Sequence, residues 1–147
     1  YFDGKDAILG ALCDMGHQRM TASMSAVDST LSYEDYFFEI GQAYIRFAKQ
    51  NPDLYLLMFA QAPEWSIEQM SEPGSSYLIL QETIAHGVEI GFITPHEGFG
   101  QDDMAFTAWA TVHGISMLAI TYFRNVPVDL THSEEETLRN MLRGFAD

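Results

Sequence analysis

The sequence has a single cysteine, few basic residues and no long apolar run. With Cys13 alone, no disulfide can form within the chain, and a reducing, cytoplasmic compartment is expected. Seven Lys and Arg residues stand against 21 Asp and Glu residues, and the formal net charge of −14 opposes contact with a nucleic-acid backbone. No stretch approaches the roughly eighteen consecutive apolar residues of a membrane span, so no membrane partner is expected.

Motifs of catalysis are also missing. The sequence contains no G-x-S-x-G nucleophile motif and no glycine-rich phosphate loop. Cys13 lies on the apolar side of a predicted helix, where a cysteine usually serves as a small apolar residue. We therefore expect no enzyme, no catalytic residue and no cofactor.

The composition and the spacing of apolar residues predict one helical domain. The 147 residues are 47% apolar, which is enough to build a core. No useful segment alternates with period two, whereas helical spacing recurs throughout, so the fold class is all-α with about six helices. Ser32 and Asn51 are the clearest N-caps. The helices are expected at about 5–23, 33–51, 52–63, 76–89 and 102–124, and a last helix is expected from about 131 or 133 to 145.

One helix face carries residue types that bind metals. Glu82, His86 and Glu89 are spaced i, i+4 and i+7, so they fall on one side of a helix. Di-iron bundles use such groups, together with further ligands from other helices. The alternative function is therefore a helical-bundle metal protein or enzyme built on these residues and His113. The simpler interpretation is a solvated polar face with no metal site.

The chain is rich in aromatic residues and methionine, with ten Phe, seven Tyr, two Trp and eight Met. Several rings that carry a polar atom fall on inward faces, where the polar atom needs a partner. This pattern favours a lined cavity, and methionines give such a cavity adaptable walls. A dry core in a purely structural dimerisation module stays open as an alternative.

Four segments resemble one family of proteins. Residues 1–9 resemble the exit from the helix-turn-helix of TetR/AcrR-type regulators, and residues 109–115 resemble the Trp-His-Gly signature of one class of their C-terminal domains. Residues 43–48 and 51–59 are similar to the same class, and the order of the helices matches along the whole chain. The sequence therefore resembles the C-terminal regulatory domain of a TetR/AcrR-type transcriptional regulator.

The resemblance implies a division of the chain and a function. Residues 1–4 would be the remnant of an N-terminal helix-turn-helix domain that is otherwise missing, and residues 5–147 the ligand-binding and dimerisation domain. Such regulators are homodimeric repressors that release operator DNA when a small molecule binds, and the first helix links the pocket to the DNA-binding domain. Only Tyr1 and Lys5 match positions that touch the DNA backbone, so this chain alone is not expected to hold an operator.

The resemblance also places a pocket between the second, fourth and fifth helices, for a small apolar or aromatic ligand. Few cations are expected near it, which favours a neutral or cationic ligand over an anionic one. The candidate ligand-binding residues are Tyr44, Tyr55, Phe59, Trp65, Tyr77, Trp109, His113 and Met117. The last two long helices are expected to form a four-helix interface with those of a second subunit. The candidate interface residues are Leu118, Tyr122, Leu138, Met141, Leu142 and Phe145.

Overall fold

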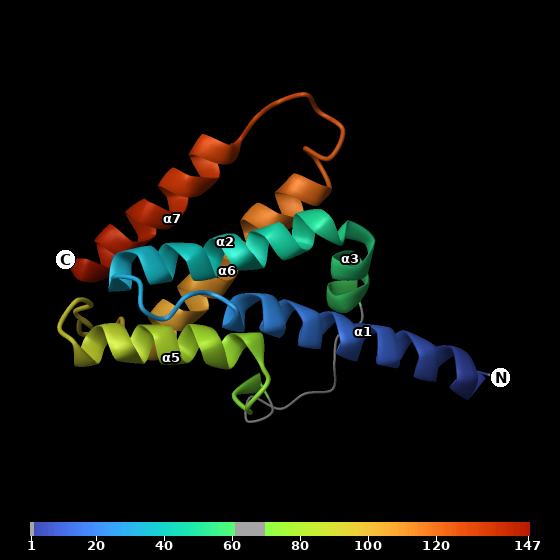
Figure 1. Cartoon of the computed structure of the whole chain (residues 1–147), viewed down its shortest axis with the longest axis horizontal. Helices are drawn as coiled ribbons and strands as arrows, with labels where there is room; N and C mark the ends of the chain where they lie inside the picture. The colour runs from blue at the N-terminus through green and yellow to red at the C-terminus, as the bar shows by residue number, and fades with distance from the viewer. Residues whose placement is uncertain (1, 61–69) are drawn as a thin grey trace.

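The computed structural model describes residues 2–60 and 70–147 (Figure 1). Apart from one isolated bridge between His96 and Phe99, the regular structure in these residues is helical. The helices are α1 (Phe2–Ser25), α2 (Tyr33–Gln50), α3 (Pro52–Ala60), α5 (Ser76–Glu89), α6 (Gln101–Ile120) and α7 (Thr131–Ala146). The predicted all-α fold is confirmed. None of the described helices combines the length and the apolar character needed to cross a membrane.

Most helix boundaries follow the predicted ones, and two differ. α1 extends beyond the predicted 5–23 at both ends, and residues 2–4 form part of its first turn. α6 ends at Ile120 rather than near Arg124. The N–H of Phe123 donates to the carbonyl of Leu118 at 3.0 Å, five residues back rather than the four of an α-helix, and this wider turn ends the helix. No glycine or proline at this point of the sequence indicates the helix end. The predicted end of the third helix, near residue 63, lies outside the described residues.

The predicted N-cap of α2 is present, and Asn51–Pro52 ends the helix as predicted. The Asn51 side chain, predicted to cap the next helix, instead donates to the carbonyl of Phe47 at 3.1 Å. Ser32 Oγ accepts a hydrogen bond from the N–H of Asp35 at 3.2 Å, which satisfies a donor of the first turn. Asn51 ends α2 by donating its N–H to Phe47, and its carbonyl accepts the N–H of Tyr55 in α3. Because a residue before proline avoids the α region, Asn51 separates two helices that would otherwise run on.

α2 is the central helix of the molecule. It packs against α1, α3, α6 and α7 and buries Ile40, Tyr44 and Phe47 on its inward side. α7 approaches α2 closely at Gly41, where a Cβ atom would lie 3.0 Å from Cδ1 of Leu138. A larger side chain at Gly41 would therefore push the two helices apart.

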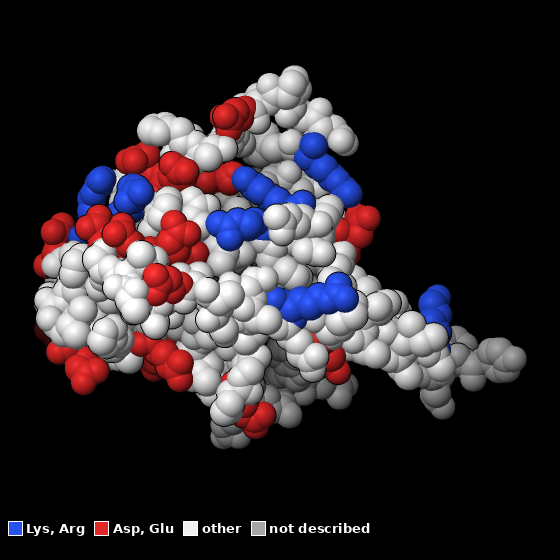
Figure 2. Space-filling model, in the orientation of Figure 1, with Lys and Arg blue, Asp and Glu red and all other residues white. Residues whose placement is uncertain are grey.

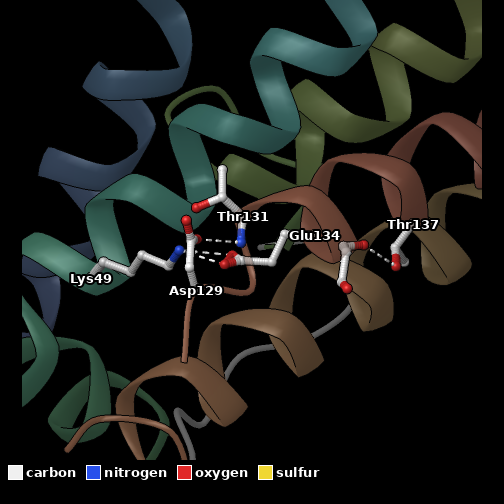
Figure 3. Close-up of polar contacts among 6 residues, drawn as sticks. Lys49, Asp129, Thr131, Glu134 and Thr137 are labelled. Carbon is white, nitrogen blue, oxygen red and sulfur yellow. Dashed lines mark hydrogen bonds and ion pairs between the residues drawn. The ribbon is translucent and has the colours of Figure 1, made fainter. Parts of the chain in front are cut away.

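Polar contacts fix the start of α7 over the end of α2 (Figure 3). Lys49 of α2 forms an ion pair with Glu134 in the first turn of α7. Asp129 Oδ1 accepts the N–H of Thr131 at 3.0 Å, and hydrogen bonds from Thr131 lower the pKa of Asp129. Asp129 and Glu134 lie at the N-terminus of α7, where the positive end of the helix dipole stabilises negative charge.

The packing of α7 corrects part of the expected dimer interface. Leu138, Leu142 and Phe145 are only 1%, 4% and 4% exposed within the single chain. They fill the core because the one apolar stripe of α7 faces α2 and its neighbours. Among the other candidates, Leu118 and Tyr122 are 49% and 81% exposed and remain accessible to a partner.

Candidate functional site

A cavity of about 490 Å³ opens between α1, α3, α6 and the segment that leads into α5. Its volume falls within the range of roughly 300–1,000 Å³ in which proteins hold small molecules. The walls are mainly apolar, with polar groups from α1 and from the segment before α5. The described residues that line it are Asp14, His17, Gln18, Met58, Phe59, Met70, Glu72, Pro73, Gly74, Ser75, Ser76, Tyr77 and Trp109.

A hydrogen bond between residues far apart in the sequence holds the segment before α5 against α1. Thr21 Oγ1 donates to the carbonyl of Gly74 at 3.0 Å, across 53 positions of sequence. Gly74 has a φ of +94°, a conformation that favours glycine. Ser75 Oγ then accepts the N–H of Tyr77 at 3.2 Å and caps α5. These contacts place the Tyr77 ring at the cavity.

Aromatic side chains from several helices form the wall. The Phe59 ring lies 5.9 Å from the His17 ring and 4.4 Å from the His113 ring. Tyr77 and Trp109 lie 5.4 Å apart, one from α5 and one from α6. Packed rings of this kind offer flat apolar surfaces to a ligand while contacting one another at favourable angles.

A chain of hydrogen bonds lies behind this wall. The hydroxyls of Tyr44 and Tyr55 are 2.8 Å apart, and the Tyr55 hydroxyl lies 2.6 Å from Nδ1 of His113. Both tyrosines are 0% exposed. The chain joins α2, α3 and α6, so it fixes the helices that support the cavity from behind.

Burial keeps all three groups neutral. It raises the pKa of Tyr44 to about 12 and raises the pKa of Tyr55 further. Burial also lowers the pKa of His113 below its ordinary value of 6.5, so the ring is neutral at pH 7. In one consistent arrangement, Tyr44 donates to Tyr55 and Tyr55 donates to Nδ1 of His113.

The predicted ligand-binding residues fall into distinct places. Phe59, Tyr77 and Trp109 line the cavity. His113 lies behind the wall against Phe59. Tyr44, Tyr55 and Met117 belong to the core around the cavity rather than to its wall. Trp65 lies outside the described residues.

The position of the cavity corrects the expected one. It lies against α5 and α6 as predicted, but α1 and α3 take the place expected for α2. The reason is that α3 packs across α1, and its Tyr55 covers Tyr44 of α2. The residues missed by the sequence analysis are the α1 group around Asp14, the 70–76 segment and Met58 of α3. The first two are polar or lie near a loop, so no apolar periodicity marks them, and Met58 looks like any other core residue of its helix.

Two titratable groups of α1 line the cavity, His17 and Asp14. Burial lowers the pKa of His17, and the nearby Asp14 carboxylate opposes this effect. The His17 ring packs edge-on against Phe59. The side of α1 that meets the cavity therefore combines a carboxylate, an amide and an imidazole.

The residues of the alternative metal site do not form one. His86 Nδ1 lies 3.8 Å from Glu89, and their side chains are 60% and 81% exposed. Within residues 2–60 and 70–147, no group of three or more His, Cys, Asp or Glu side chains could hold a metal ion. The i, i+4, i+7 spacing thus produces an exposed polar helix face, which contradicts the alternative of a metal site built on these residues.

Comparison with known proteins places the chain in a family. Residues 37–141 match the model of the tetracyclin repressor-like C-terminal domain, so the chain belongs to that family. It is also similar to the solved structure of a protein with unknown function from Rhodococcus sp. RHA1. That likeness has a TM-score of 0.80 at 25% sequence identity and covers 97% of this chain and 73% of the other. None of the curated proteins matches the chain.

Proposed function

We propose that this chain is the ligand-sensing and dimerisation domain of a TetR/AcrR-like repressor, and that a small apolar or aromatic molecule bound in the cavity causes release of DNA. The observation that carries the proposal is a cavity of ligand size, about 490 Å³, to which α1 contributes a wall. Membership of the tetracyclin repressor-like family supports a regulatory ligand-binding role.

The geometry of α1 suits it to transmit binding. The helix has 24 residues, which corresponds to a length of roughly 36 Å. Asp14, His17 and Gln18 meet the cavity, whereas Ile8 nearer the N-terminus is 63% exposed. In Figure 1 this N-terminal part extends beyond the other helices. A small rotation of α1 at the cavity would therefore produce a larger displacement at its free end.

Ligand binding acts in this proposal by shifting a conformational equilibrium. A ligand changes the tilt of α1 only if it binds one orientation more tightly than the other. In a dimer, the tilt of α1 sets the separation of the two DNA-binding domains. This separation must match DNA half-sites about 34–36 Å apart or a multiple of that distance. With its charge of −14, the isolated chain needs a basic DNA-binding domain to hold an operator.

The outer face of α6 supports dimerisation with a second copy. Phe106 and Leu118 are 61% and 49% exposed and share one helix face with Gly114, where an added Cβ would meet nothing within 4 Å. Sedimentation should show a dimer for the parent chain and a monomer for the Phe106→Glu, Leu118→Glu double variant. The matched control is Ile8→Glu, which places a charge on an exposed apolar position of α1 and should stay dimeric. A dimeric double variant would contradict this interface.

The proposal is tested by operator binding in a protein that joins this domain to a DNA-binding domain. A compound that saturates the cavity should weaken operator binding by at least tenfold. Trp109→Ala removes a cavity wall and should abolish the response. Phe92→Ala removes a ring of similar burial outside the cavity and should preserve it. Equal operator affinity with and without the compound would refute the repressor mechanism and favour a purely structural dimerisation module.

A further inference from the structure

The cavity has an acidic mouth and an aromatic interior. We propose that its ligand is an organic cation, whose apolar or aromatic body packs against the rings while its ammonium group lies at the mouth near Asp14 and Glu72. This inference rests on the proposed ligand-sensing function and specifies the class of molecule that is sensed. It excludes carboxylates and phosphates as ligands of this site.

The charges that face the cavity are negative. Asp14 comes from α1 and Glu72 from the segment before α5, and both side chains are exposed. The described lining contains no Lys or Arg. His17 adds no stable positive charge, because burial lowers its pKa.

The cations of the chain lie elsewhere. Lys49 is held by Glu134, and Arg124 lies 3.2 Å from Asp53. Figure 2 shows the Lys and Arg side chains mainly over α1, α2 and α7, whereas the lower edge of the view, where the segment before α5 lies, shows acidic side chains and no basic ones. An anionic ligand would therefore enter a mouth of like charge with no compensating partner among the described lining residues.

The interior suits the apolar body of the ligand. The rings of Phe59, Tyr77 and Trp109 line it and offer apolar surface on which an aromatic or aliphatic body can pack. Met58 and Met70 add polarizable, adaptable surface for the apolar body of the ligand. Burial and the nearby Asp102 carboxylate both raise the pKa of Tyr77, so its hydroxyl stays neutral beside further negative charge.

The contribution of the Asp14 and Glu72 carboxylates to the affinity for a cation follows from their exposure to solvent. A unit charge pair about 4 Å apart in a water-like environment is stabilised by ~1 kcal/mol, which is about fivefold in Kd. Salt screens such pairs, so the preference for a cation should shrink at high ionic strength. Removing either carboxylate should weaken binding of a cation by about fivefold and leave a neutral ligand of the same shape unaffected.

The test uses three probes that share a phenylbutyl body and differ in the head group, on the 147-residue chain. They are trimethyl(4-phenylbutyl)ammonium, its neutral analogue with tert-butyl in place of trimethylammonium, and the anion 5-phenylpentanoate. Calorimetric titration gives Kd for each probe with the parent chain, Asp14→Asn and Glu72→Gln. The matched control is Glu89→Gln, which removes the same charge at the far end of α5, roughly 20 Å from Tyr77.

The expected result is binding of the cation at least fivefold tighter than the neutral probe, with no binding of the anion. Asp14→Asn and Glu72→Gln should each lower the affinity for the cation alone, and Glu89→Gln should not. If the neutral probe binds as tightly as the cation, the ligand class is wrong while the cavity remains a binding site. If none of the three probes binds, both the ligand class and the sensing role of the cavity are refuted.

Discussion

The hydrogen-bonded chain behind the cavity predicts unequal costs for two similar substitutions. In Tyr55→Phe, the central hydroxyl is lost, so two hydrogen bonds disappear, one to Tyr44 and one to Nδ1 of His113. In Tyr44→Phe, the terminal hydroxyl is lost, and Tyr55 can still donate to His113. Both tyrosines are fully buried, so an unsatisfied group cannot turn to water.

The magnitudes follow from counting the hydrogen bonds of the chain that each substitution removes, which are two for Tyr55→Phe and one for Tyr44→Phe. We expect Tyr55→Phe to lower the free energy of unfolding by about 2 kcal/mol and Tyr44→Phe by about 1 kcal/mol. For a chain near this length, each kcal/mol corresponds to roughly 2–4 °C in Tm. The control is Tyr122→Phe, at a hydroxyl on an 81% exposed side chain, and its cost should stay below about 0.5 kcal/mol.

Urea denaturation followed by circular dichroism measures these differences. The double variant Tyr44→Phe, Tyr55→Phe should cost less than the sum of the two single variants, because the same hydrogen bond is removed in both. The reasoning is refuted if Tyr44→Phe costs as much as Tyr55→Phe, or if neither differs from Tyr122→Phe.

Three further predictions concern pH, packing and the contact between α2 and α7. Burial lowers the pKa of His113, so the imidazole binds a proton more readily in the unfolded chain than in the folded one, and the free energy of unfolding should be at its full value above about pH 6.5 and fall below it. The urea midpoint followed from pH 8 to 5 should show this fall, and the fall should be shallower in His113→Gln. Gly87→Ala places a methyl group against the side chains of Tyr33 and Ile93 and should cost about 1–3 kcal/mol of stability, whereas Gly10→Ala adds a methyl group in open space on a helix and should stabilise by up to about 1 kcal/mol. A higher Tm for Gly87→Ala than for Gly10→Ala would contradict this prediction. Lys49→Met should lower stability by about 1 kcal/mol at low salt and by less at high salt, and an equal loss at both salt concentrations would exclude the ion pair with Glu134 as the cause.

The fold was predictable because its signals are local. Ser32 and the Asn51–Pro52 pair mark helix boundaries through hydrogen-bonding and steric rules that act within a few residues. The end of α6 carries no such mark. A wider hydrogen-bonded turn closes the helix at Ile120, and the sequence analysis therefore extended it too far.

The site was predictable only in part, from the family resemblance and from aromatic residues on inward faces. Of the residues selected in this way, the structure brings Phe59, Tyr77 and Trp109 to one cavity. Asp14 and Glu72 are ordinary acidic residues in the sequence. Their place at the cavity depends on how α1 crosses α3 and on the contact between Thr21 and Gly74, and one-dimensional periodicity contains neither.

The same limit explains the error in the dimer interface. Leu138 and Leu142 form an apolar stripe that fits either a partner helix or the core of the same chain. Only the three-dimensional position of α7 against α2 distinguishes the two, and it places the stripe inside.

The most direct test of the central claim is a calorimetric titration that asks whether ligands bind in the cavity between α1, α3, α5 and α6. A panel of cationic, neutral and anionic aromatic compounds is first screened by thermal shift, in which a compound at a hundred times its Kd stabilises by about 2.7 kcal/mol. The best compound is then titrated into the parent chain, Trp109→Ala and Phe92→Ala. The account predicts binding to the parent chain and to Phe92→Ala, and affinity at least tenfold weaker for Trp109→Ala. Equal affinity for all three proteins would show that the ligand binds elsewhere and would contradict the account.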